Sequence, residues 1–317
     1  MIEVMGITKK YGAKVAVEDV SFTAENGQIL GLLGRNGAGK STTMNIVTGY
    51  ISSDAGTARI DGHDILEEPL EAKKRIGYLP EHPPLYYEMT VREYLSFVCQ
   101  LKGVKKEDMT AHLDEILGRI HIDDVKERLI GNLSKGYRQR VGLAGALCGS
   151  PDTIIMDEPT VGLDPMQIIE IRNIIKELGK QHTIILSSHI LKEIADICTH
   201  VVILNGGRKV ADDSMQNLLQ TSEGKRVTVV RVSDKQSSFL PQLQSVQGVE
   251  SVKELGARES GFTDFEVTSP VQADVRKALF CKVAEEGRAL VMLKSTELTL
   301  EDVFARLTME DDRERAV

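Results

Sequence analysis

The amino-acid sequence predicts an α/β protein that carries a helical insertion and is followed by a smaller α+β domain. From residue 2 to about residue 214, short apolar runs of strand length alternate with helical stretches, as in α/β proteins. Between about residues 91 and 132 the pattern is helical and contains no convincing strand. The chain turns polar at 221–224 and the order of elements then changes. A chain of 317 residues is long for one domain, so two are expected.

The first domain is predicted over residues 1–220, with the helical insertion at about 88–150. Its buried strands are expected at residues 28–33, 153–156, 183–186 and 201–204. Its helices are expected at residues 40–48, 91–101, 107–120 and 166–178. In the last of these, isoleucines and a leucine recur at helical spacing, which indicates one apolar face.

Residues 225–308 are predicted to form a small ferredoxin-like domain. Strand and helix patterns follow one another there in the order β-α-β-β-α-β, which is the order of that fold. The expected strands are 226–232, 249–255, 262–267 and 289–293, and the expected helices are 236–246 and 271–286. Residues 309–317 are charged and are expected to form a frayed tail.

The composition argues against a nucleic-acid-binding protein. The chain has 39 basic and 47 acidic residues, a net charge of −8, whereas a broad footprint on a phosphate backbone needs a basic surface. Aromatic residues make up only 4% of the chain and tryptophan is absent, which disfavours a base-stacking platform. No nucleic-acid partner is therefore expected.

The cysteines and the apolar runs indicate a cytoplasmic chain. Cys99, Cys148, Cys198 and Cys281 fit neither a metal site nor a disulfide framework, as expected in a reducing cytosol. The N-terminus lacks the apolar core of a signal peptide. No window reaches the roughly 18 uninterrupted apolar residues that a membrane span needs. If the protein works at a membrane, another chain is expected to supply the spanning part.

A glycine-rich motif is the strongest functional signal. The pattern G-x-x-x-x-G-K-[ST] is matched by Gly34, Arg35, Asn36, Gly37, Ala38, Gly39, Lys40 and Ser41. The motif follows a predicted strand and opens a predicted helix, so backbone N–H groups and the positive end of the helix can surround a phosphate. Lys40 is expected to reach the β- and γ-phosphates, and the Ser41 hydroxyl to bind Mg²⁺. The sequence therefore predicts a nucleoside triphosphate site.

Two adjacent carboxylates follow the buried strand at 153–156. Open α/β sheets bind their ligands at the carboxyl edge of the strands, where Asp157 and Glu158 are expected to lie. Asp157 is expected to hold Mg²⁺ and Glu158 to act as general base on the attacking water. An apolar run that ends in acidic residues is common, and the pairing with the glycine-rich motif gives it weight.

With these motifs and four others in order, residues 2 to about 220 resemble the ATP-binding cassette (ABC) ATPase family. Residues 132–140 resemble the family's signature segment, and 159–164 resemble the loop that touches the opposite subunit. His189 matches the family's switch histidine and Tyr11 the aromatic residue that stacks on adenine. Each assignment has a plainer alternative. Ser134 and Gly136 could merely cap a helix, His189 could be a surface histidine, and Tyr11 could be an ordinary loop residue.

The resemblance implies a set of roles. It makes Lys40, Glu158 and His189 the catalytic residues, adds Thr42 and Tyr11 to the nucleotide-binding motif, and makes Ser41, Asp157 and Glu81 the Mg²⁺ ligands. Ser134, Lys135 and Gly136 would bind the γ-phosphate of ATP held by a partner subunit, and Glu81 and Asp164 would lie in coupling and dimer loops. ATP and Mg²⁺ are therefore the expected cofactors, and a head-to-tail homodimer the expected assembly.

Two motifs depart from the family pattern. Glu81 stands where the family commonly has glutamine, which adds negative charge near the phosphates but still offers an oxygen ligand. Lys135 and Tyr137 replace the usual glycine and glutamine of the signature, while Ser134 and Gly136 are retained. Neither change excludes activity.

Three functions fit this pattern. The first is the motor of an exporter at the inner face of the cell membrane, paired with a separate integral membrane permease. Residues 76–81 and 300–304 resemble the ATPase subunits of ABC-2 type exporters, and residues 83–87 are either a permease-docking surface or a rigid loop packed on its own domain. The second is a soluble ABC ATPase that acts on a ribosome or nucleic-acid complex. The third is a non-catalytic nucleotide-binding regulator, against which the intact catalytic residues argue.

Overall fold

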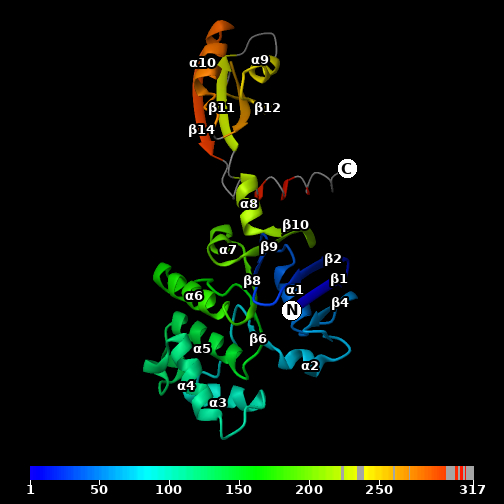
Figure 1. Cartoon of the computed structure of the whole chain (residues 1–317), viewed down its shortest axis with the longest axis vertical. Helices are drawn as coiled ribbons and strands as arrows, with labels where there is room; N and C mark the ends of the chain where they lie inside the picture. The colour runs from blue at the N-terminus through cyan, green and yellow to red at the C-terminus, as the bar shows by residue number, and fades with distance from the viewer. Residues whose placement is uncertain are drawn as a thin grey trace. The chain divides into compact units, whose positions relative to one another are not determined.

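The computed structural model describes residues 1–222, 225–233, 239–259, 261–270, 272–297, 304–305, 308–309 and 311 (Figure 1). The chain forms two compact units, Met1–Met215 and Gln216–Val317. Most of the predicted charged tail and of the 300–304 segment lies outside the described residues.

A six-stranded sheet forms the centre of the first unit, in the order β10-β9-β3-β8-β7-β6. Its strands are β3 (Ile29–Leu33), β6 (Ile76–Leu79), β7 (Thr153–Met156), β8 (Thr183–Ser188), β9 (His200–Asn205) and β10 (Arg208–Ser214). All pairs are parallel except β9 with β10. Every residue of β3, β7 and β8 is buried, as expected for parallel strands covered on both faces. The carboxyl ends of five strands therefore meet at one edge.

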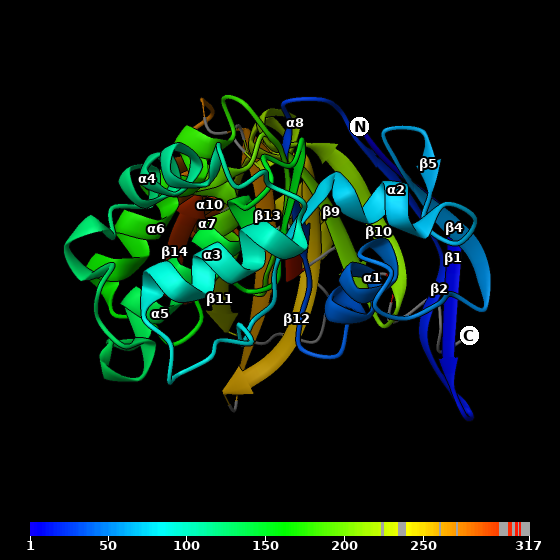
Figure 2. The ribbon, with the colours of Figure 1, turned by 90° about the horizontal axis from the view of Figure 1, so that it is seen from below.

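A second, antiparallel sheet was not predicted. It has the order β2-β1-β4-β5 and consists of β1 (Ile2–Tyr11), β2 (Lys14–Ala24), β4 (Ala55–Ile60) and β5 (His63–Asp64). One apolar core joins both sheets, because Ile2 and Val20 belong to the same buried cluster as Leu30 and Ile155. Figures 1 and 2 place this sheet and the helical insertion on opposite sides of the first unit.

The four helices predicted for the first unit are present at or near their predicted ranges, and other helices that had no predicted range lie among them. They are α1 (Lys40–Val47), α2 (Pro69–Lys74), α3 (Val91–Leu101), α4 (Met109–Ile120), α5 (Lys135–Leu147), α6 (Pro165–Leu178) and α7 (Leu191–Ile197). The insertion consists of α3, α4 and α5 with two 3-10 turns, Asp123–Val125 and Ile130–Asn132. It begins with a capping box, in which the Thr90 hydroxyl accepts from the Glu93 amide and the Glu93 carboxylate accepts from the Thr90 amide.

The second unit begins at Gln216, within α8 (Met215–Ser222), which is earlier than the predicted start at residue 225. It continues as β11 (Lys225–Ser233), α9 (Leu240–Gln244), β12 (Ser251–Glu259), β13 (Phe262–Pro270), α10 (Arg276–Glu285) and β14 (Leu290–Glu297). The sheet is antiparallel with the order β12-β13-β11-β14, and its core contains Phe239 and Phe265. The β-α-β-β-α-β order is the predicted one. Within the described ranges both helices are shorter than predicted; α10 begins only at Arg276, whose amide donates to the Asp274 carboxylate.

The four cysteines differ in their burial. Cys99, Cys148 and Cys198 are buried and Cys281 is exposed on α10; all four are free thiols. Burial raises the pKa of the Cys198 thiol. Within the described ranges, no three His, Cys, Asp or Glu side chains are grouped as metal ligands. None of the helices in those ranges combines the length and the apolar character that crossing a bilayer requires.

Candidate active site

The glycine-rich motif forms the turn between β3 and α1. Gly37 and Gly39 have φ of +82° and +103°, and a Cβ at Gly39 would lie 2.8 Å from the Ala16 carbonyl oxygen. Only glycine meets both conditions, because other residues rarely adopt positive φ and a side chain would strike the backbone. No side chain caps the N-terminus of α1, so its first N–H groups remain available to an anion. Lys40 is buried and its ammonium donates to the Gly34 carbonyl over 2.8 Å.

Asp157 and Glu158 directly follow β7, and the neighbouring strand β8 holds them in place. The Ser187 hydroxyl donates to Asp157 Oδ1 over 2.5 Å and accepts from the Glu158 amide over 2.9 Å. Glu158 has φ of +48°, an uncommon backbone conformation for a residue with a side chain. Both carboxylates are buried. One serine therefore fixes the side chain of the first and the backbone of the second.

The Glu158 carboxylate lies between the Lys40 ammonium and the His189 imidazole. Its Oε1 is 3.3 Å from Lys40 Nζ, and its Oε2 is 2.9 Å from His189 Nδ1. Burial of an unpaired carboxylate is costly, so the Lys40 ammonium is the charge that makes this position tolerable. The three predicted catalytic residues therefore form one connected group.

A cavity of about 500 Å³ opens onto this group. It is lined by Tyr11, Lys14, Ala16, Asn36, Gly37, Gly39, Lys40, Ser41, Thr42, Glu81, Glu158, Val161 and His189. A neighbouring cavity of about 620 Å³ is lined by Arg35, Asn36, Gly37, Ala38, His189, Asn205 and Gly206. Of the residues predicted to bind Mg²⁺ or the nucleotide of the same chain, all but Gly34 and Asp157 line one of these two cavities; Gly34 packs against Leu204 and Ala38, and Asp157 is bound by Ser187.

The signature residues do not line either cavity. Ser134 caps α5, where its hydroxyl accepts from the Tyr137 amide over 3.4 Å, and Lys135 is exposed. A Cβ at Gly162 would lie 2.1 Å from Lys135 Nζ, so the ammonium lies directly over this glycine. Asp164 caps α6 by accepting from the Met166 and Gln167 amides, each over 3.0 Å.

Two residues of this region were missed in the sequence. Ser187 could have been found in the sequence, since it is a polar residue at the carboxyl end of a buried strand, the edge at which Asp157 and Glu158 were also expected. Glu193 carried a weaker signal, since it stands one helical turn before Ile197 on the apolar face of α7. Polar residues at buried positions of this kind need partners, and both have them.

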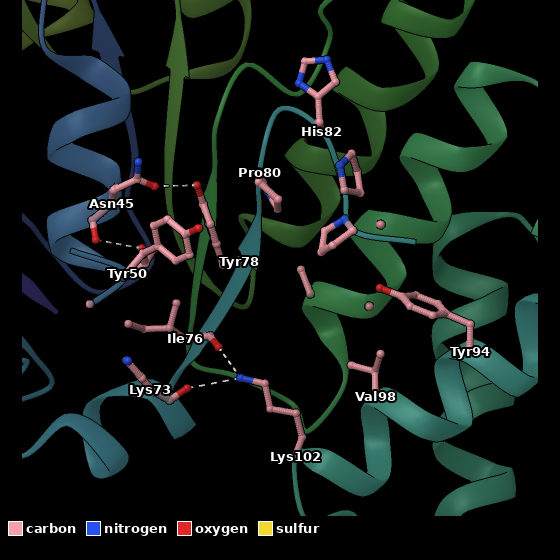
Figure 3. Close-up of a pocket in the computed structure, with 17 residues that line it drawn as sticks. Asn45, Tyr50, Lys73, Ile76, Tyr78, Pro80, His82, Tyr94, Val98 and Lys102 are labelled. Atoms are coloured by element: carbon pink, nitrogen blue, oxygen red, sulfur yellow. Dashed lines mark hydrogen bonds between the residues drawn. The ribbon is translucent and has the colours of Figure 1, made fainter. Parts of the chain in front are cut away.

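A groove of about 840 Å³ separates the α/β core from the helical insertion (Figure 3). From the core it is lined by Asn45, Thr48, Gly49, Tyr50, Lys73, Ile76, Tyr78 and Pro80, and from the following segment and the insertion by His82, Pro83, Pro84, Tyr94, Val98, Lys102, Gly142, Gly145 and Ala146. At its floor, Lys102 donates to the carbonyls of Lys73 and Ile76 over 3.2 and 2.8 Å. Desolvation raises the pKa of Tyr78 to about 12, and its hydroxyl donates to Asn45.

Comparison with known proteins gives a consistent result. Residues 17–161 match the ABC transporter family. The chain is 30% identical to the linearmycin resistance ATP-binding protein LnrL of Bacillus subtilis (strain 168), over 97% of this chain and 98% of that protein. It is 31% identical to the bacitracin transport ATP-binding protein BcrA of Bacillus licheniformis, over 97% of each. A solved ATP-binding subunit of an ABC transporter is 31% identical, with a TM-score of 0.64 over 70% of this chain and 92% of that one.

The chain belongs to the ABC transporter family, as an ATP-binding and ATP-hydrolysing subunit. These relatives confirm the expected exporter-type ATPase and the α/β cassette fold. The similarity to LnrL and BcrA extends over both units of the chain, whereas the similarity to the solved subunit covers about the length of the first.

Proposed function

We propose that two copies of this chain bind two ATP molecules between them and drive a separate membrane permease as an exporter. The observation that supports a dimer is that the catalytic residues and the signature residues of one chain do not line the same cavity. The glycine-rich turn, Glu158 and His189 line one cavity, while Ser134 and Lys135 of the same chain do not. A second copy, related by a two-fold axis, would bring its own signature to the open side of that cavity.

The direct contact of Lys40 with Glu158 supports their catalytic roles. When ATP binds, its phosphates compete for the Lys40 ammonium, and the Glu158 carboxylate exchanges that partner for water. A carboxylate held by His189 and adjacent to the γ-phosphate is then placed to take the proton of the attacking water. His189 is 40% exposed at its side chain, so it can contact both the carboxylate and the phosphate. Tyr11, which lines the same cavity, would stack on adenine.

The residues at this edge fit a magnesium ion. Mg²⁺ prefers oxygen ligands, and Ser41, Asp157 and Glu81 offer a hydroxyl and two carboxylates from the ends of three elements. The ion would neutralise part of the phosphate charge. Ser187 holds Asp157 in one orientation, which is how a ligand carboxylate is usually fixed.

The groove between core and insertion is the proposed permease-docking site. Pro80 and His82 line this groove, and Glu81 between them lines the nucleotide cavity. One short segment therefore contacts both places, so a change at the phosphates can reach a segment docked in the groove. Of the run 83–87, Pro83 and Pro84 line the groove, while Tyr86 packs edge to face on Tyr94 and Phe97 of its own insertion.

The export direction and the location rest on the relatives. A resistance protein and a bacitracin transport protein match over nearly the whole chain, and we extend their kind of activity to it. The motor would then lie at the cytoplasmic face of the membrane, held by its permease. The acidic net charge of −8 disfavours action on a ribosome or nucleic acid. The predicted C-terminal domain, at about residues 225–308, would serve as an accessory domain.

Affinity purification from detergent-solubilised membranes tests the permease. The variant Tyr50→Asp places a charge in the groove at a side chain that is 79% exposed, so the fold should tolerate it. Ile169→Asp is the matched control, because Ile169 is also exposed and α6 contributes nothing to the groove. We expect the parent and the control to retain a stoichiometric polytopic membrane protein and Tyr50→Asp to lose it. Recovery of soluble partners alone, or equal recovery with both variants, would contradict the proposal.

A further inference from the structure

A buried carboxylate outside the nucleotide cavity joins three parts of the catalytic region. Glu193, on α7, is only 3% exposed. Its Oε2 accepts from the Thr160 hydroxyl over 2.8 Å and from the Ser188 hydroxyl over 3.0 Å. Its Oε1 lies 3.6 Å from Arg172 Nη2 on α6. A carboxylate at such a position persists only when its oxygens are well satisfied, and here each has a partner.

The two hydroxyls that meet at Glu193 belong to the catalytic segments. Thr160 is two residues after Glu158, and the Val161 amide donates back to the Glu158 carbonyl, which closes a tight turn. Ser188 immediately precedes His189 and also accepts from the Ile190 amide over 3.0 Å, so its side chain braces the backbone on both sides of the histidine. One oxygen atom, Glu193 Oε2, therefore binds both the turn that follows Glu158 and the residue that precedes His189.

The last two residues of β8 divide this work between them. Ser187 binds Asp157 and the Glu158 amide on one side of the strand, and Ser188 binds Glu193 on the other. Without Glu193, Ser187 would still hold the start of the turn. The far end of the turn and the segment bearing His189 would lose their common partner.

We propose that Glu193 is a positioning residue for ATP hydrolysis. It holds the turn after Glu158 and the segment before His189 in one arrangement, which keeps the contact of 2.9 Å between Glu158 and His189. Glu193 does not line the nucleotide cavity, so it acts through these two residues and not on ATP itself. The inference rests on the proposed roles of Glu158 and His189.

The variant Glu193→Gln tests this role. A glutamine is neutral and has one acceptor oxygen. Either its NH2 group faces the Arg172 cation and the ion pair is lost, or its NH2 group faces the two hydroxyls, which must then accept from it and can no longer donate to it. We expect kcat of the full-length chain with MgATP to fall roughly tenfold to hundredfold, since small displacements of catalytic groups have effects of this size. ATP affinity should stay near that of the parent, because the glycine-rich turn is untouched.

Asp196→Asn is the matched control. Asp196 lies on the same helix and pairs with the same Arg172 over 2.7 Å, but it touches neither Thr160 nor Ser188. It should keep the kcat of the parent. If Glu193→Gln also keeps that kcat, or if both variants lose kcat and the unfolding midpoint together, Glu193 has only a structural role.

Changes at the two hydroxyls decide the question even where Glu193→Gln fails to fold. Thr160→Val and Ser188→Ala should each lower kcat, and Thr160→Ser, which keeps the hydroxyl, should restore it. Unchanged kcat in both deletion variants would overturn the inference. The variant Glu158→Gln distinguishes failure of the proposed function from failure of the inference about Glu193. If Glu158→Gln hydrolyses ATP at the rate of the parent, the proposed function fails. If Glu158→Gln is inactive while the variants at Glu193, Thr160 and Ser188 keep the parent kcat, only the inference about Glu193 fails.

Discussion

The α/β core and the helical insertion prepare their functional residues in opposite ways. In the core, Glu158 is buried and is held by Lys40, His189 and Ser187 at once. In the insertion, Ser134 makes one long capping contact and Lys135 lies exposed over Gly162. Glu158 in the core half therefore already has partners in its own chain, whereas Ser134 and Lys135 in the insertion half are exposed at the positive end of α5. Such a difference is expected when the second half serves a different molecule.

Mixed dimers give the largest expected effect. Ser134→Glu keeps a residue that suits a helix N-terminus but repels phosphate, and Glu158→Gln removes the general base. Each variant alone should hydrolyse ATP at roughly a hundredth of the parent rate or less. Mixed in equal amounts before ATP is added, about half of the dimers combine both variants, and each has one intact site of two. About a quarter of the parent ATPase rate should therefore return.

This recovery depends on the two halves coming from different chains. If each chain completed its own site, every site in the mixture would carry one lesion and no activity would return. A mixture of Glu158→Gln with Lys40→Ala is the control: both changes lie in the core half, so neither site is intact in any pairing and no activity should return.

A substitution at Asp164, at the end of the loop 159–164, should give an intermediate effect, on stability. Asp164 caps α6 through two amides, so Asp164→Ala should lower the free energy of unfolding by about 1 kcal/mol, as measured by urea denaturation. Asp164→Asn should restore most of this, since asparagine is an equally good cap. An asparagine variant that is stable but hydrolyses ATP slowly would show that the carboxylate also serves a partner subunit.

A contact between core and insertion gives the smallest effect, on pH dependence. His182 lies before β8; its Nδ1 is 2.8 Å from the Pro151 carbonyl oxygen and its Nε2 is 3.2 Å from Arg119 on α4. Desolvation lowers the pKa of His182, aided by Arg119 and opposed by the Pro151 carbonyl and Asp152. The unfolded chain then binds a proton below about pH 6.5 that the folded chain resists.

Stability from neutral His182 is therefore complete above that pH and falls as the pH drops through it. Urea denaturation at about pH 7.5 and 5.5 should show a larger loss for the parent than for His182→Gln. His82→Gln is the control, since that ring is 88% exposed, and it should behave like the parent. An equal loss in all three proteins would mean that other groups carry the pH dependence.

The sequence was most informative where function depends on neighbouring residues. The glycine-rich turn, the Asp157-Glu158 pair and the segment before His189 are short and local, and the strand before each was legible from its apolar run. Parallel pairing then brings these strand ends to one edge. Even the cap at Asp164 had a local signal, because a proline follows it at the first helical position.

Features that depend on distant residues were not legible. Glu193 gains its meaning from Thr160, Arg172 and Ser188, which meet only in the folded chain. The antiparallel sheet escaped prediction because the pairing of β1 with β2 and with β4 contains register shifts, which interrupt the regular alternation of side chains. The positive φ of Glu158 likewise arises from its surroundings and not from its residue type.

The distribution of the four thiols makes the native chain convenient for spectroscopy. Cys281 on α10 is exposed, while the other three cysteines are buried. A maleimide fluorophore or nitroxide should therefore attach at one position per chain without prior removal of other cysteines. In a dimer, two such labels report the separation of the second units directly, with and without ATP.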